Sequence, residues 1–223
     1  MADFEHNTIK QPVTSIPAGE MLHLGKGYTR DAMLRPASTK LKAWRILASR
    51  GLLERPPWMS LWEEDVRLPG GLLIEGYLRC ATREYAMTFA LLADGTVPLV
   101  LQYKHGVGAL SYDLPAGYLE GPDEEPLAAA KRELREETGI EAEHWETLGR
   151  LVIDTNRGGS SAHLFLATDA YAAGQPHLDA TEDLEVRFHT PRELGDMVLS
   201  GEITSMASAA AVMMGLERLR RSG

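Results

Sequence analysis

The chain has 223 residues, of which 44% are hydrophobic and 25% are charged, and its formal net charge is −9. This composition is typical of a globular protein with a sizeable core, and the acidic balance excludes a mainly electrostatic grip on nucleic acid or anionic membranes. The single cysteine, Cys80, excludes an internal disulfide, so we expect a reducing, cytoplasmic environment. The N-terminus lacks a basic start and an apolar segment, and no apolar run reaches the roughly 20 residues needed to cross a bilayer.

The N-terminal part of the chain, residues 1–83, is predicted to be an extension of a main domain that spans residues 84–223. Up to about residue 37 its proline, glycine and polar residues show no periodicity, which indicates an irregular arm. From Ser38 the sequence allows either a short helix or strands between about residues 44 and 53, and the pattern alone does not decide between them. The consecutive prolines at 56 and 57 lack backbone donors and predict a break.

Short apolar runs separated by turns then predict a series of strands. Strands are expected at residues 71–78, 84–92, 97–103, 146–155, 161–170 and 183–190. The second and third flank the turn-forming pair Asp94-Gly95, so we expect an antiparallel hairpin there. The fourth and fifth are joined by the turn-prone residues 156–160. Two helices close the chain, one beginning at Pro191 after the N-cap Thr190 and one running from about Ser205 to Arg220.

A further helix is predicted from about Pro126 to Thr138, ahead of the fourth strand. Proline suits the first turn of a helix, and Gly139 is placed to end it. Leu127, Ala130 and Leu134 recur at spacings of three and four residues. They form an apolar stripe that we expect to pack against the core.

A second face of this helix carries Glu133, Glu136 and Glu137 at positions i, i+3 and i+4. Each like-charge i,i+4 pair destabilises a helix by roughly a few tenths of a kcal/mol, so a cluster of three acidic residues is unfavourable unless nearby positive charge offsets the repulsion. Arg132 lies four residues before Glu136, and a solvated helix laced with salt bridges is one interpretation. A site for a hard divalent cation such as Mg²⁺ or Mn²⁺, which prefers oxygen ligands, is the other.

The segment resembles the Nudix box of the nucleoside-diphosphate-linked-moiety hydrolases. That box reads glycine, five residues, Glu, seven residues, then Arg-Glu-apolar-x-Glu-Glu-x-Gly-apolar. The fixed positions of its second half are matched by Arg132, Glu133, Leu134, Glu136, Glu137, Gly139 and Ile140, and Glu124 stands eight residues before the arginine. Six residues rather than five separate Gly117 from Glu124. This one-residue insertion is expected to alter the shape of the loop and leave the helix unchanged.

The resemblance implies a Nudix fold, which is an α/β/α sandwich with a mixed central sheet. It also implies that Glu133 and Glu137 are the principal ligands of Mg²⁺ or Mn²⁺, with Glu136 as a further or water-mediated ligand. The backbone oxygen of Ala116 would be another ligand. Arg132 would orient the cluster from behind the ligands.

The reaction that the resemblance implies is metal-dependent hydrolysis of a pyrophosphate bond. In the ADP-ribose branch of the family, the general base is expected on a mobile loop well after the box. The matching acidic loop here spans residues 178–186. Glu182 is the candidate base, with Asp183 and Glu185 as rivals, and a solvated turn residue before a strand is the alternative interpretation of Glu182.

The surroundings of the box resemble the ADP-ribose pyrophosphatase branch, in which a strand ending in Gln-Tyr-Arg leads to Leu-Pro-Ala-Gly. Here Gln102-Tyr103 precedes Leu-Pro-Ala-Gly at 114–117. This implies that ADP-ribose or a related nucleoside diphosphate sugar is split into a nucleoside monophosphate and a sugar phosphate. The branch tends to carry a proline about sixteen residues past the box, where this chain has Asn156. Other substrates (GDP-mannose, a dinucleotide cofactor), a non-catalytic nucleotide-sugar sensor and an unrelated α/β protein therefore stay open.

Four residues are candidate contacts for the substrate: Lys104, His105, Glu120 and Arg157. Lys104 and His105 stand where the branch places a phosphate-facing arginine, although solvation at the surface is the simpler interpretation. Trp58 and Trp62 are candidates for stacking on a base, including across a homodimer, with burial at a domain junction as the alternative. The resemblance implies a homodimer with contacts from the N-terminal extension, and a small nucleotide sugar as partner rather than nucleic acid or a membrane.

Overall fold

The structure, a computed structural model, describes residues 40–121, 123–179 and 182–222. It divides into two compact units, with the boundary between Thr82 and Arg83. The irregular arm predicted for residues 1–37 lies outside the described residues. No helix in the described part of the chain is long and apolar enough to cross a membrane.

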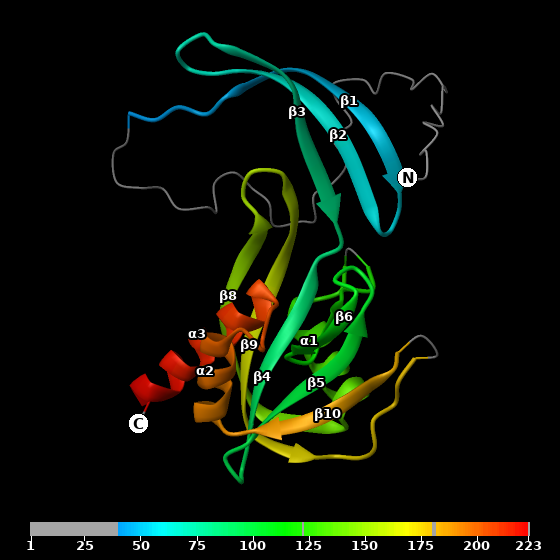
Figure 1. Cartoon of the computed structure of the whole chain (residues 1–223), viewed down its shortest axis with the longest axis vertical. Helices are drawn as coiled ribbons and strands as arrows, with labels where there is room; N and C mark the ends of the chain where they lie inside the picture. The colour runs from blue at the N-terminus through cyan, green and yellow to red at the C-terminus, as the bar shows by residue number, and fades with distance from the viewer. Residues whose placement is uncertain (1–39, 122, 180–181, 223) are drawn as a thin grey trace, which may run out of the picture. The chain divides into compact units, whose positions relative to one another are not determined.

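The first unit is an antiparallel meander of three strands (Figure 1). These are β1 (Arg45–Arg55), β2 (Met59–Arg67) and β3 (Leu73–Thr82). The segment that the sequence left between helix and strand is thus a strand, because it pairs with β2 from Arg45 to Arg55. The predicted break at the two prolines is confirmed as the turn between β1 and β2, where the Trp58 amide donates to the Arg55 oxygen at 2.8 Å.

The second unit contains two sheets and three helices. Its strands are β4 (Tyr85–Leu92), β5 (Val97–Lys104), β6 (Ala109–Asp113), β7 (Ala116–Tyr118), β8 (Ile140–Asp154), β9 (Gly158–Ala172) and β10 (Leu184–His189). Its helices are α1 (Pro126–Thr138), α2 (Pro191–Ser200) and α3 (Met206–Ser222). In the larger sheet β4 pairs parallel to β9 and antiparallel to β7, while β8 pairs antiparallel to β9, so the sheet is mixed. The smaller sheet is antiparallel, in the order β10-β5-β6.

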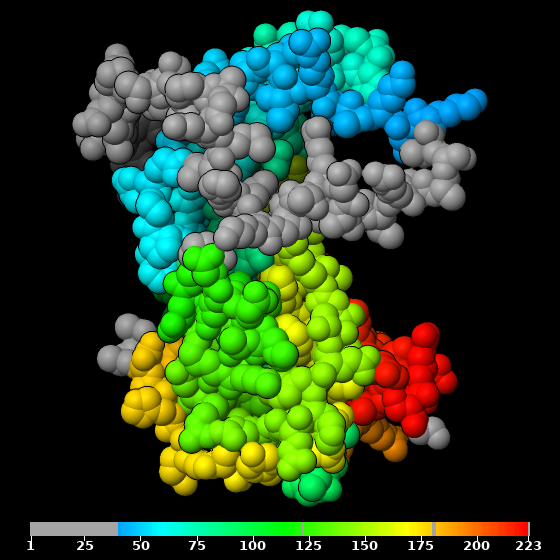
Figure 2. Space-filling model, turned by 180° about the vertical axis from the view of Figure 1, so that it is seen from behind, coloured from blue at the N-terminus to red at the C-terminus, as the bar shows by residue number. Residues whose placement is uncertain are grey.

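The larger sheet lies between helices on its two faces. Successive side chains of β4 and β9 point to opposite faces, and because apolar residues stand on both, each face has to be covered. On one face the core contains Met87, Phe89, Leu164 and Leu166 of the sheet, Leu194 of α2 and Val212 of α3. On the other face it contains Ala86, Ala90, Phe165 and Ala167 of the sheet with Ala129, Ala130 and Leu134 of α1. Figure 2, seen from the opposite side, shows the lime-green residues of α1 and β8 on the near face of this unit and the red residues of α3 at its edge. The predicted α/β/α sandwich with a mixed central sheet is confirmed.

The hairpin predicted around Asp94-Gly95 is wrong, although the turn itself forms. The Gly95 amide donates to the Leu92 oxygen at 2.9 Å, but β4 and β5 then enter different sheets. The reason is that β5 pairs on its two edges with β6 and β10 in the smaller sheet, while β4 pairs along Tyr85–Leu92 with β9. The hairpin predicted across residues 156–160 does form, between β8 and β9.

Helix α1 has the predicted bounds, and its C-terminal end holds the loop that follows β9. Gly139 ends the helix with φ at 71°, and a Cβ there would lie 2.4 Å from the backbone oxygen of Gly174. The Gly139 oxygen accepts hydrogen bonds from the amides of Ala173 and Gly174 at 2.8 and 3.1 Å. The His177 amide donates to the Glu136 oxygen at 2.7 Å. These bonds direct the loop between β9 and β10 along the helix.

Candidate metal centre

The segment between β6 and α1 is held against the helix by its own backbone. The Pro115 oxygen accepts a hydrogen bond from the Thr88 amide of β4 at 3.0 Å. One residue further on, the Ala116 amide donates to Glu137 Oε2 at 2.8 Å. A Cβ on Gly117 would lie 2.0 Å from the carboxyl carbon of Glu133, so only glycine allows this approach. The Leu-Pro-Ala-Gly segment thus brings the backbone of Ala116 and Gly117 into direct contact with the carboxylates of Glu137 and Glu133.

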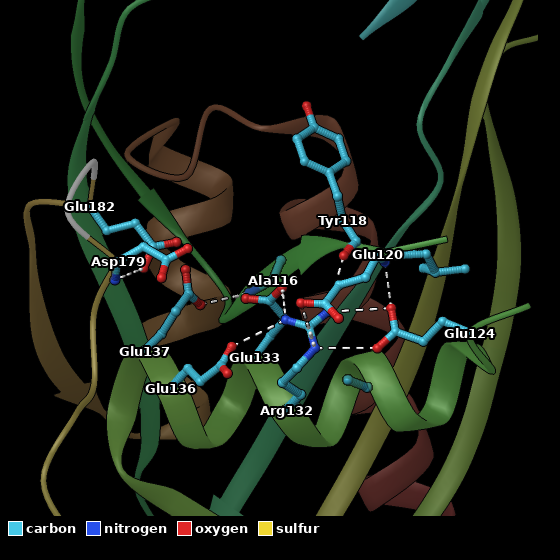
Figure 3. Close-up of polar contacts among 12 residues, drawn as sticks. Ala116, Tyr118, Glu120, Glu124, Arg132, Glu133, Glu136, Glu137, Asp179 and Glu182 are labelled. Carbon is cyan, nitrogen blue, oxygen red and sulfur yellow. Dashed lines mark hydrogen bonds and ion pairs between the residues drawn. The ribbon is translucent and has the colours of Figure 1, made fainter. Parts of the chain in front are cut away.

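Three carboxylates converge at this place from two segments far apart in the sequence (Figure 3). Glu133 and Glu137 come from α1 and are 8% and 3% exposed, and Glu182 comes from the loop before β10. Each offers one oxygen, and these oxygens lie within 4.8 Å of one another. Asp179 orients the third member, because its amide donates to Glu182 Oε2 at 3.0 Å and its oxygen accepts from the Glu182 amide at 2.9 Å.

Burial and neighbouring negative charges raise the pKa values of the two glutamates that α1 contributes, Glu133 and Glu137. Burial raises the pKa of Glu137 to about 8, and the charges of Glu133 and Glu182 act in the same direction. The pKa of Glu133 is also raised, first by burial and then by Glu136 and Glu182, despite the opposing effect of Arg132. Oxygen ligands in a poorly solvated, negatively charged cluster are the donor set that hard divalent cations prefer. The residues present therefore fit a divalent metal ion.

Arg132 connects the loop and the helix behind the cluster. It donates to Glu133 Oε1 at 2.6 Å, to Glu136 Oε2 at 3.1 Å, to Glu124 Oε1 at 3.2 Å and to the Tyr118 oxygen at 3.1 Å. Burial opposes its positive charge, but these acidic partners outweigh burial and raise the pKa of Arg132. Burial likewise opposes ionisation of Glu124, and the Glu120 amide together with Arg132 reverses this and lowers the pKa of Glu124. The inserted residue has not separated Glu124 from the arginine.

Glu136 is brought to Arg132 rather than to the three converging carboxylates. Its side chain is 41% exposed and pairs with the guanidinium in an i,i+4 arrangement. The sequence offered a salt-bridged helix and a metal site as alternatives, and the structure contains both the ion pairs of Arg132 and a carboxylate cluster that fits a cation. Glu136 takes part only in the ion pairs, Glu137 only in the cluster, and Glu133 in both, because its Oε1 accepts from Arg132.

The four candidate substrate contacts lie at different places in the second unit. Lys104 ends β5, and its positive charge opposes the rise in the pKa of Glu137 that burial causes. His105 follows in an exposed turn, with its ring centre 6.3 Å from that of Tyr103. Glu120 is 72% exposed, with Oε1 4.0 Å from the Arg132 Nε.

Arg157 lies in the turn between β8 and β9, where its guanidinium approaches Asp154 Oδ2 at 3.5 Å. The two alternatives to Glu182 are not in the cluster, since Asp183 is exposed and Glu185 pairs with Arg187. Trp58 is 62% exposed and belongs to the first unit. Trp62, in the same unit, donates from its indole nitrogen to Glu64 Oε1 at 2.9 Å.

Sequence reasoning missed three contributors to this arrangement. The Tyr118 oxygen accepts from Arg132, but a backbone acceptor has no signature in the sequence. Asp179 holds Glu182, and the spacing Asp-x-x-Glu, which resembles that of a capping box, was an available signal. The role of Gly117 as the point of closest approach to Glu133 required the fold.

Comparison with known proteins gives a consistent result. The sequence model of the NUDIX domain matches residues 82–206. An ADP-ribose pyrophosphatase of Mycobacterium tuberculosis is 34% identical over 163 residues, which cover 69% of this chain and 74% of that protein. An ADP-ribose pyrophosphatase of Bacillus subtilis is 28% identical over 161 residues, covering 69% and 83%. The crystal structure of an ADP compounds hydrolase matches with a TM-score of 0.73 at 22% identity, covering 83% of this chain and 99% of that one.

Proposed function

Since the chain belongs to the NUDIX family, we propose that it is a divalent-metal-dependent pyrophosphohydrolase acting on ADP-ribose or a related nucleoside diphosphate sugar. The products are a nucleoside monophosphate and a sugar phosphate. The observation that carries this proposal is the convergence of Glu133, Glu137 and Glu182 beside the Ala116-Gly117 backbone. A buried cluster of this kind has little use as a solvated surface and fits a cation.

The proposed cofactor is Mg²⁺ or Mn²⁺, held by Glu133 and Glu137 with the Ala116 carbonyl oxygen and with Glu136 directly or through water. When bound, such an ion neutralises charge on a diphosphate and lowers the pKa of a bound water. Arg132 is proposed to fix the rotamers of the ligands from behind, which its bonds to Glu133 and Glu136 support.

Glu182 is the proposed general base for the attacking water. It is the acidic residue of its loop whose carboxylate reaches the cluster, and its hydrogen bond from the Asp179 amide holds it there. A neighbouring carboxylate that accepts the proton of the nucleophile contributes typically 10²- to 10⁴-fold to a rate. Asp183 and Glu185 are disfavoured by their exposure and by the pairing of Glu185 with Arg187.

Contacts with the substrate are proposed for the polar side chains around this cluster. Lys104, whose charge acts on Glu137, is proposed to meet a diphosphate, and His105 follows it in the turn after β5. Glu120 and Arg157 are exposed and are proposed to contact the sugar portions or the terminal phosphate.

ADP-ribose is proposed as the preferred substrate because two relatives are named ADP-ribose pyrophosphatases. Asn156 replaces the proline of that branch, so GDP-mannose and dinucleotide cofactors belong in the test. A sensor that binds a nucleotide sugar without hydrolysing it is the alternative from another class. The intact set of box carboxylates supports the enzyme.

A homodimer joined through the N-terminal extension, residues 1–83, is also proposed. Within the first unit β1 is an edge strand, exposed along nearly its whole length, and it carries Ile46, Leu47, Leu52 and Leu53. Exposed apolar edge strands are usually covered, and a second copy of the chain is the proposed cover. The unpaired thiol of Cys80 supports a cytoplasmic location.

The test is hydrolysis of ADP-ribose, GDP-mannose, a dinucleotide cofactor and other nucleoside diphosphate derivatives, followed as phosphate released by a coupled phosphatase. We expect turnover with Mg²⁺ or Mn²⁺ and none in EDTA, with ADP-ribose used best. Glu137→Gln should abolish turnover, whereas Glu143→Gln, at an exposed position of β8, should not.

Retention of metal-dependent activity by Glu137→Gln would contradict the assignment of the site. Binding of Mn²⁺ and of a nucleotide sugar without turnover of any compound would favour the sensor. Preference for another nucleoside diphosphate sugar would keep the reaction and change only the substrate.

A further inference from the structure

A further buried carboxylate, that of Asp113, lies outside the candidate centre and has no part in the proposed reaction. Asp113, the last residue of β6, is 8% exposed. Ser208, which is fully buried in the first turn of α3, donates its hydroxyl to Asp113 Oδ1 at 2.7 Å. The two residues are 95 positions apart in the sequence, so the bond ties a sheet edge to the C-terminal helix.

The surroundings are suited to holding Asp113 in one position. Its carboxylate accepts from the Ser208 hydroxyl in the first turn of α3, a short bond between two buried groups. Tyr85 is close by, and burial together with the charge of Asp113 raises the pKa of Tyr85 to about 12, so this phenol stays neutral. A polar pair sealed in an otherwise apolar cluster tolerates few alternative arrangements.

Only two residues separate Asp113 from the backbone of the centre. Leu114 is fully buried in the same core, and the Pro115 oxygen is bonded to the Thr88 amide. Ala116 then donates to Glu137, and Gly117 lies against Glu133. Fixing Asp113 at one end of this short segment therefore fixes the backbone that meets the carboxylates at the other.

We infer that Asp113 is a positioning residue, and that Ser208 of α3 clamps it so that Ala116 and Gly117 are set against Glu137 and Glu133. The inference rests on the metal centre of the proposed function and not on its substrate. It assigns to α3, which carries none of the candidate ligands, a part in setting the affinity for the ion.

The experiment removes the clamp and measures the ion and the backbone directly. Ser208→Ala deletes the donor with little change in volume, and the matched control is Ser161→Ala, at a fully buried serine of β9 whose hydroxyl has no partner among the described groups. Mn²⁺ affinity is measured by calorimetry on the full chain. Exchange of the backbone amides of Leu114 and of residues 116–118 is measured by hydrogen–deuterium exchange in EDTA.

We expect Ser208→Ala to weaken Mn²⁺ binding by about tenfold or more, as loss of a residue supporting metal ligands typically does. Exchange at Leu114 and residues 116–118 should become faster, and the KM for substrate should change less than the Mn²⁺ concentration needed for half-maximal rate. Asp113→Asn keeps an oxygen that accepts the Ser208 hydroxyl and should lose less. If Ser208→Ala does not fold, Ser208→Cys, with a similar shape and a weaker donor, should show the same change in smaller measure.

Unchanged Mn²⁺ affinity and unchanged exchange in the folded variant would overturn the inference, as would equal losses in Ser161→Ala. Failure of the wild-type protein to bind Mn²⁺ would overturn it together with the metal centre. A wild-type protein that binds Mn²⁺ but hydrolyses no nucleoside diphosphate derivative would refute the proposed reaction and leave this inference to be decided by the binding data.

Discussion

Removing the charge of Glu137 is predicted to change how the stability of the metal-free protein depends on pH. Burial, and then the charges of Glu133 and Glu182, raise the pKa of Glu137 from 4.5 to about 8 in the folded state. In the unfolded chain the same group titrates near its ordinary value. Between these two values the folded protein therefore holds a proton that the unfolded chain has released.

The sign and size of the effect follow from this difference. Because the folded state binds more protons, the free energy of unfolding falls as the pH rises through this window. One pKa unit corresponds to about 1.4 kcal/mol, so the change from 4.5 to about 8 amounts to on the order of 5 kcal/mol at most. Stability should be highest near the lower end of the window and should be lost toward its upper end. Glu133, whose pKa is also raised, adds in the same direction.

The assay is urea unfolding in EDTA at several values between about pH 5 and 8, for the wild-type protein, Glu137→Gln and Glu143→Gln. Glu137→Gln has no charge at this position and should show a much shallower dependence on pH, while the exposed Glu143→Gln should follow the wild type. Adding Mn²⁺ at the upper end should stabilise the wild type, because an ion that binds only the folded state shifts the equilibrium toward it. Parallel pH profiles for wild type and Glu137→Gln would refute the reasoning.

Three further predictions concern the candidate centre and the first unit. Gly117→Ala should weaken Mn²⁺ binding by about 10- to 100-fold, because its Cβ would lie 2.0 Å from the Glu133 carboxyl carbon, and unchanged calorimetric affinity would contradict this. Glu182→Gln should lower kcat by about 10²- to 10⁴-fold, whereas Glu185→Gln should stay near wild type in the same assay, and the reverse result would move the base to Glu185. Leu52→Glu, on the exposed edge strand, should halve the mass measured by light scattering, and a mass equal to that of the wild-type protein would contradict the dimer contact.

The helix of the candidate centre was predictable because its signals are local. Pro126 at the first turn, Gly139 at the end and an apolar stripe between them fix the bounds of α1 without help from the rest of the chain. The spacing of Glu133 and Glu137 on that helix places them on one side of it. These are features that a linear sequence carries in full.

The pairing of the strands and the position of Glu182 depend instead on contacts between segments that are distant in the sequence. The turn at Asp94-Gly95 was correctly identified, but the strand pairing was not, because β4 pairs with β9, more than sixty residues later, while β5 pairs with β6 and β10. That Glu182 reaches the cluster depends on hydrogen bonds from the amides of Gly174 and His177 to the end of α1. Such bonds leave no periodic pattern in the sequence, so the loop was predicted only from its resemblance to the corresponding loop of the Nudix family.

Because the carboxylates of the candidate centre come from two distant segments, the centre can be completed only late in the synthesis of the chain. A nascent chain that has emerged only as far as β9 already contains Glu133 and Glu137, but it lacks Glu182. Ser208, on a still later helix, has not yet reached Asp113. Tight capture of an ion should therefore wait until the last third of the second unit has been made, so that an incomplete polypeptide does not sequester metal and loading marks a finished molecule.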